Sequence, residues 1–301
     1  MIQWLVFSLF ILIALFLDLF VLHRKPHKVS VKESLLLSFF WISLGLGFGL
    51  YVWYTKGYTH ATEYITGYLL EKSLSLDNIF VFILIFSYFK IPEEYRHKIL
   101  FWGVFGAIIM RAVFIFTGIG LVERFDWITY LFGFILLASA VKLLTTEEKE
   151  FYPEETLVYK IARKLIPLRP DYHNGSFFIK EGKKVYATPL FLTLVFVESS
   201  DLMFAIDSVP AILAISRDPF VVYTSNIFAI LGLRSLYFAA DAILPMFHYL
   251  HYGLAFILGF IGVKMLVSDF YHIPVGVSLL LIMSAILVSI LASVISKNVK
   301  N

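Results

Sequence analysis

Nine long apolar runs dominate this chain of 301 residues and constrain its fold more than any other feature of the sequence. A helix needs about 20 mostly apolar residues to cross the hydrocarbon core of a membrane, and each run approaches or exceeds that length. The runs cover residues 2–22, 34–54, 62–89, 97–121, 127–145, 188–215, 220–240, 252–268 and 274–296. The pattern predicts an all-α polytopic membrane protein with about nine transmembrane helices.

Composition excludes several other classes of protein. Only 16% of the residues are charged and 59% are hydrophobic, whereas soluble domains carry about 25% charge. We therefore expect a lipid bilayer around the chain rather than water. A net charge of +3 gives no reason to expect nucleic acid as a partner, and the absence of cysteine excludes disulfides and thiolate metal sites.

Basic residues outside the apolar runs indicate the orientation. If the runs cross the membrane alternately, 17 lysines and arginines lie on one side and 3 on the other. Loops rich in lysine and arginine stay in the cytoplasm. This asymmetry predicts an outside N-terminus and a cytoplasmic C-terminus.

The predicted organisation has five parts. These are an N-terminal two-helix segment (1–61), a first transmembrane repeat (62–145), a cytoplasmic loop (146–187), a second repeat (188–269) and a C-terminal helix (270–301). The cytoplasmic loop is small, and alternating residues on both sides of Gly182 predict a β-hairpin within it.

The two repeats are predicted from three matches that keep their order. Residues 71–78 align with 201–208, 105–111 with 228–234, and 134–142 with 256–264. Each unit contains three spans, so its two copies enter the membrane from opposite sides. Such inverted three-helix repeats are common in transporters, whose substrate site lies near the midplane.

Five acidic residues lie near the middle of the first spans of the two repeats. A charged residue at the centre of a membrane helix costs roughly 2.5–3.5 kcal/mol on insertion scales, so these side chains are expected to face one another, water or ions. The five are Glu71, Asp77, Glu198, Asp201 and Asp207.

Helical spacing divides these acids into two sets. Residues seven apart share a helix face, which pairs Glu71 with Asn78 and Asp201 with Ser208. Glu198 precedes Asp201 by three residues and lies on the same face. We expect this face of each helix to supply oxygen ligands to a metal ion.

Asp77 and Asp207 lie six residues beyond their partners, well away from that face in a regular helix. A local break would bring them to the same ion. Pro210 supplies a reason for one in the second repeat, because it has no N–H to bond the carbonyl of Ile206. The first repeat has no such proline.

The expected ligands are carboxylate, amide and hydroxyl oxygens, which suit Mn²⁺, Mg²⁺ or Ca²⁺ rather than Cu⁺ or Zn²⁺. Clustered acids repel one another and take up protons when no metal is bound, so metal binding is expected to release protons.

Charged neighbours allow a second interpretation, in which the acids form structural ion pairs. Arg111, Arg234 and Lys72 are the candidate charge-pairing or gating residues. Three cations cannot neutralise five acids. Asp18 lies near the cytoplasmic end of the first span and is either an interfacial residue or an inner-gate ligand.

Residues 71–81 and 198–211 resemble the paired signatures of the TerC family of integral membrane proteins, and in particular its Alx-type manganese exporters. Residues 225–234 and 267–274 extend the resemblance over nearly the whole chain. The resemblance implies a multi-pass protein of the cell inner membrane that exports divalent metal, chiefly manganese, from the cytoplasm.

Two functions of different class remain open from the sequence. The first is a secondary transporter that exports Mn²⁺ as its substrate, in exchange for protons. The second is a non-transporting scaffold or insertion partner with a structural metal site. No nucleophile–base pair, P-loop or nucleotide motif is found, so no enzyme is expected. The sequence leaves the oligomeric state open.

Overall fold

The computed structural model describes residues 2–17, 31–145, 175–181, 184–243, 249–271 and 273–300, together with residues 156, 159–161, 164, 166–169 and 172. Asp18 lies outside these residues. Asp77 is described only through its backbone, as are residues 241–243.

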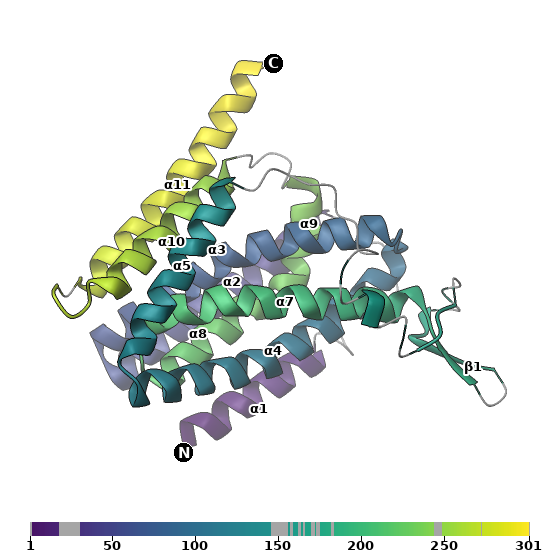
Figure 1. Ribbon diagram of the computed structural model, residues 1–301, viewed down its shortest axis with the longest axis horizontal. Helices are drawn as coiled ribbons and strands as arrows, with labels where there is room; N and C mark the ends of the chain where they lie inside the picture. Colours follow the sequence, from purple (N-terminus) through teal and green to yellow (C-terminus); the bar gives the residue numbers. More distant parts are fainter. Residues whose placement is uncertain are drawn as a thin grey trace.

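Helices make up most of this part of the chain (Figure 1). In chain order the elements are α1 (Ile2–Leu17), α2 (Val31–Lys56), α3 (Tyr58–Tyr88), α4 (Glu93–Arg124), α5 (Trp127–Thr145), β1 (Phe178–Glu181), β2 (Lys184–Ala187), α7 (Pro189–Leu213), α8 (Pro219–Leu231), α9 (Leu233–Ile243), α10 (Leu250–Leu266) and α11 (Val275–Lys300).

Among the described residues, five helices are long and apolar enough to cross a membrane, namely α2, α4, α5, α7 and α11. The pair α8 and α9 makes a sixth if it is counted as one broken span. Helices α1 and α10 are apolar but shorter, and α3 has 31 residues but carries several charges. Every apolar run of the sequence thus contains a helix, while nine spans remain a prediction.

A break at Gly232 divides the segment that the sequence predicts as one span, 220–240. Helix α8 ends at Leu231, α9 starts at Leu233, and the two axes differ by 41°. The Nζ of Lys72 in α3 donates to the carbonyl of Ala229 at 3.0 Å, so a side chain bonds the last turn of α8. A Cβ at position 232 would lie 2.9 Å from the Cβ of Trp41 and 3.1 Å from that Nζ, which favours glycine at the break.

The helices pack in matched pairs. Helix α4 packs against α7, and α3 against α8; α5 packs against α10, and α3 against α7. The pairs correspond when α3 is matched with α7, α4 with α8 and α5 with α10. Under this matching the α4–α7 pair becomes α8–α3, and the other two pairs are unchanged. An internal twofold axis would produce this arrangement, and the inverted repeat itself stays a prediction.

Helices α5 and α10 approach closely where two glycines face each other. A Cβ at Gly262 would lie 2.9 Å from the carbonyl oxygen of Gly133, and a Cβ at Gly133 would lie 3.1 Å from the carbonyl oxygen of Gly262. Small residues allow such close packing of membrane helices. Helix α11 lies along α10, and the three form one group in Figure 1.

The predicted β-hairpin is confirmed. Strands β1 and β2 pair antiparallel, with Phe178 opposite Ala187 and Glu181 opposite Lys184. Strand β2 leads almost directly into α7, so the hairpin lies at the N-terminal end of that helix (Figure 1).

Candidate functional site

The guanidinium of Arg111 lies at the centre of a buried polar cluster. Arg111 is in α4, is 1% exposed, and is the largest of the fully buried side chains. Its Nη1 lies 2.7 Å from Oε1 of Glu71 and donates to Oγ of Ser208 at 2.5 Å and to Oδ1 of Asn226 at 2.8 Å. Its Nη2 lies 4.0 Å from Oδ1 of Asp201. Four helices therefore meet at one cation.

The acids in this cluster come from the first helices of the two predicted repeats. Glu71 of α3 is 1% exposed, and Asp201 of α7 is 5% exposed. Asp201 and Ser208 both approach Arg111, as expected for residues seven apart on one helix face. The structure thus brings these two predicted faces together.

Buried oxygen atoms on both α3 and α7 lack a hydrogen bond among the described residues. Asn78 Oδ1 and Asp201 Oδ2 are buried, and the described residues give neither of them a hydrogen-bond partner. Buried polar atoms are nearly always satisfied by protein, water or an ion. Asp201 Oδ2, beside Arg111, therefore marks a place where a cation or an ordered water would be stabilised.

Glu198 precedes Asp201 by three residues in α7 and is half-buried. A Cβ at Gly106 would lie 2.1 Å from Oε1 of Glu198, so the carboxylate rests directly on the backbone of α4. Gly106 precedes Arg111 by five residues. Glu198 is thus held between α7 and α4, on the helix that also carries the central cation.

Asp207 does not join this cluster. Its Oδ1 accepts a hydrogen bond of 2.6 Å from Ser139 of α5, on another face of α7. Helix α7 continues through Pro210 to Leu213, so the structure contains no break that would turn Asp207 toward Asp201. The Asp77 side chain, the predicted partner of Asp207, is not among those described.

The remaining predicted cations have separate positions. Lys72 bonds the Ala229 carbonyl at the end of α8, so its hydrogen bond goes to backbone rather than to an acid. Arg234 is buried in α9, 5% exposed. The ion pair of Glu71 with Arg111 is the contact that the structural ion-pair interpretation requires. Glu198 is not part of this ion pair.

Within the described part of the chain, no three histidine, aspartate or glutamate side chains lie close enough to hold one metal ion together. The described arrangement is instead two acids held by an arginine. A metal ion would bind there only after the guanidinium moved away from Glu71.

Sequence reasoning missed three residues of these sites. Asn226 is completely buried in α8 and accepts from Arg111. Its signal was a lone amide within an apolar span. Ser139 and Gly106 carried no recognisable signal, because a serine or glycine in a membrane helix is common.

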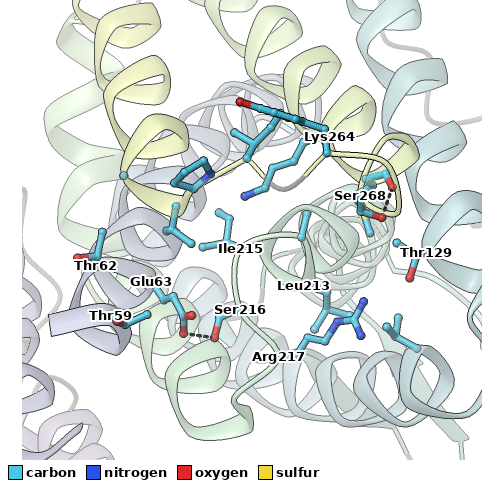
Figure 2. Close-up of a pocket in the computed structure, with 18 of the residues that line it drawn as sticks. Thr59, Thr62, Glu63, Thr129, Leu213, Ile215, Ser216, Arg217, Lys264 and Ser268 are labelled. Carbon is cyan, nitrogen blue, oxygen red and sulfur yellow. Dashed lines mark hydrogen bonds between the residues drawn. The ribbon is translucent and has the colours of Figure 1, made fainter. Parts of the chain in front are cut away.

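A separate pocket of about 660 Å³ opens where α3 begins and α4, α7 and α10 end. Figure 2 shows Lys264 reaching into it from one side, with Glu63 and Ser216 hydrogen-bonded on the other. Lys264 is 9% exposed and donates to Oγ of Ser278 at 3.0 Å. By the predicted orientation this is the outer end of the molecule. Glu63 and Lys264 thus place opposite charges around this pocket.

Long apolar helices and a buried charged cluster define a multi-pass helical membrane protein. Residues 56–301 match the model of the integral membrane protein TerC family, and the chain belongs to this family.

Relatives match over nearly their whole lengths. The chain is 47% identical over 292 residues to "Uncharacterized membrane protein STKORF319" of Myxococcus xanthus, covering 97% of this chain and 92% of the relative. It is 44% identical over 300 residues to "Putative membrane-bound redox modulator Alx" of Photorhabdus laumondii, covering 97% and 94%. It is 43% identical over 285 residues to the protein of the same name from Escherichia coli, covering 92% and 89%. No solved structure matches the chain.

Proposed function

We propose that this protein is a secondary transporter that exports a divalent metal ion, chiefly Mn²⁺, from the cytoplasm across the inner membrane in exchange for protons. The observation that carries the proposal is that Glu71 and Asp201, one from each predicted repeat, are buried beside Arg111, with Asp201 Oδ2 given no hydrogen bond by the described residues. Transporters built from inverted repeats place their substrate site at such a junction.

The donor atoms support a hard divalent cation as substrate. Glu71, Asp201 and Glu198 supply carboxylates, Asn78 an amide oxygen and Ser208 a hydroxyl. Affinity at oxygen sites generally rises from Mg²⁺ and Ca²⁺ toward transition metals, so Mn²⁺ should bind more tightly than either. Calorimetry that gave tighter binding of Ca²⁺ would favour a calcium exchanger instead.

Asp77 and Asp207 belong to the proposal as a second pair of carboxylates along the path. Asp207 lies with Ser139 on the α5 side of α7, separate from Asp201. A metal ion passing between the two places would meet acids at both. Helix movement around Pro210, which cannot hold the Ile206 carbonyl, would bring Asp207 closer.

The words "redox modulator" in the name of the Alx relatives fit an ion transporter better than thiol chemistry in this chain. The chain contains no cysteine, so it cannot itself exchange disulfides. A protein that changes the cellular concentration of a redox-active metal would alter redox state indirectly.

Reconstitution into liposomes tests the proposal. Purified protein should move Mn²⁺ down its gradient, and an opposing pH gradient of the right sign should drive Mn²⁺ uphill, while protein-free liposomes do neither. Absence of metal flux from folded, reconstituted protein would contradict transport and favour a scaffold with a structural charge cluster.

A further inference from the structure

We propose that the guanidinium of Arg111 is a tethered cation that replaces the divalent metal between Glu71 and Asp201 when the carrier is empty. The inference rests on the proposed function and adds to it a residue that resets the transporter. It starts from the position of the guanidinium among the very oxygen atoms that a metal ion would need.

The contacts of Arg111 duplicate those of a metal ion. Its Nη1 touches a carboxylate, a hydroxyl and an amide oxygen, from Glu71, Ser208 and Asn226, at 2.5–2.8 Å. Its Nη2 lies 4.0 Å from a second carboxylate, that of Asp201. Guanidinium and metal therefore compete for the same donors and cannot hold them together.

The fit of Arg111 is incomplete at Asp201, although Ser208 of the same helix accepts a hydrogen bond from it. Asp201 Oδ2 and Arg111 Nε are both buried without a hydrogen bond among the described residues. A purely structural arginine–carboxylate pair usually forms two parallel hydrogen bonds. The loose contact with Asp201 leaves one carboxylate available to an incoming cation while Glu71 is still neutralised.

Charge balance explains why a cation of the protein would replace the released metal ion. A carrier that releases a divalent cation leaves its buried acids without a counter-ion, and uncompensated charges away from water are costly. Protons can compensate some acids. Arg111 is always charged and is attached to α4, a helix separate from those of Glu71 and Asp201, so it can move into the vacated position at no cost in translational entropy.

If Arg111 has this role, its loss affects two transport modes differently. Loss of a purely structural residue would affect both modes alike. Exchange of Mn²⁺ for Mn²⁺ keeps the site filled in both directions and does not need the stand-in. Net efflux requires the empty carrier to return and does need it. Arg111 should therefore matter for net efflux and not for exchange.

The experiment compares wild type with Arg111→Met and Arg111→Lys in liposomes, measuring net Mn²⁺ efflux and Mn²⁺ exchange with isotope. Arg111→Met should bind Mn²⁺ at least about tenfold more tightly, because a competing charge a few ångströms away is removed. It should keep exchange within about twofold of wild type and lose net efflux by about tenfold or more. Arg124→Met, an exposed cation of the same helix, is the matched control and should change neither.

Arg111→Lys guards against a failure of Arg111→Met to fold. Lysine keeps the charge but cannot reach all three oxygen atoms, so net efflux should fall several-fold while exchange is kept. A variant that loses both modes equally while folded, or keeps both at the wild-type level, would overturn the proposal. If wild-type protein carries Mn²⁺ in neither mode, the proposed function itself has failed, which is a distinct result.

Discussion

At the scale of single residues, charge counting explains the centre of the molecule. Arg111 contributes one positive charge and lies beside two carboxyl groups, those of Glu71 and Asp201, while Glu198 packs against the same helix at Gly106. One guanidinium cannot neutralise two ionised acids, so a proton or a further cation is required. The acids were predictable from the sequence because mid-span charges are rare. Asn226 was not, because an amide costs less to bury.

Gly106 offers a way to move Glu198 without changing any charge. A Cβ there would lie 2.1 Å from the carboxylate, so Gly106→Ala must displace the Glu198 side chain. We expect Mn²⁺ flux in liposomes to fall by about tenfold while the protein still folds and inserts. Gly120→Ala in the same helix has open space around it and serves as control. Equal flux from both variants would remove Glu198 from the transport path.

Asp218, at the N-terminus of α8, should make the stability of the fold fall at acidic pH. Burial acts to raise its pKa, but the hydrogen bond from Lys56 and that from the backbone of Val221 outweigh burial and hold the pKa below its usual range. A lowered pKa in the folded state means that Asp218 stabilises the fold above pH about 4 and loses that effect as pH falls through the folded pKa.

The corresponding variant is Asp218→Ala, which removes a helix cap that accepts from the N–H groups of Phe220 and Val221. Thermal unfolding in detergent at pH 7 should show a loss of about 1 kcal/mol. The difference from wild type should shrink below pH 4. Asp218→Asn keeps the cap and should lose less. A difference that is the same at pH 7 and pH 3 would contradict this assignment.

At the scale of elements, apolar runs predicted where helices lie but not where they break. Both halves of 220–240 are apolar, and the contacts at the break come from distant positions, because Lys72 of α3 bonds the Ala229 carbonyl and lies beside Gly232. Pro210 shows the reverse case. It is a local signal for a break, yet α7 stays helical around it because a proline in a packed membrane helix is tolerated.

The close contact of α5 with α10 gives a prediction about stability. Gly262→Ala would place a Cβ 2.9 Å from the backbone oxygen of Gly133, so the helices must separate. We expect a loss of about 1–3 kcal/mol, the usual cost of overpacking, seen as a lower midpoint of thermal unfolding in detergent.

Gly259→Ala is the control in the same helix, because its Cβ would meet Ala140 at an ordinary 3.7 Å. It should leave the midpoint nearly unchanged. If the two alanine variants unfold at the same temperature, the glycine contact does not hold α5 and α10 together.

At the scale of the whole molecule, the order of three sequence matches predicted which helices correspond, and the observed packing pairs map onto one another under that correspondence. The orientation in the membrane was predicted from basic residues alone. Contacts within the protein carry no information about that orientation. The positions of the acids were only partly predictable. Helical spacing placed Asp207 off the face that Asp201 shares with Ser208, but it did not identify Ser139 as the partner of Asp207.

Orientation can be measured cleanly because the chain has no cysteine of its own. We expect a membrane-impermeant maleimide to label Thr59→Cys in intact cells and Lys180→Cys only after the membrane is opened. Both positions are exposed, Thr59 at the start of α3 and Lys180 in the hairpin. Labelling of Lys180→Cys in intact cells would reverse the proposed orientation.

The most direct test of the central claim, that the buried junction of α3 and α7 carries the metal ion, is Mn²⁺ flux through Asp201→Asn protein in liposomes. Asparagine keeps the size of the side chain and removes the charge that lies 4.0 Å from Arg111. The account predicts that flux falls at least about a hundredfold while the protein remains folded and inserted. Glu94→Gln, an exposed acid at the start of α4, should transport as wild type does. Wild-type flux through Asp201→Asn would contradict the account.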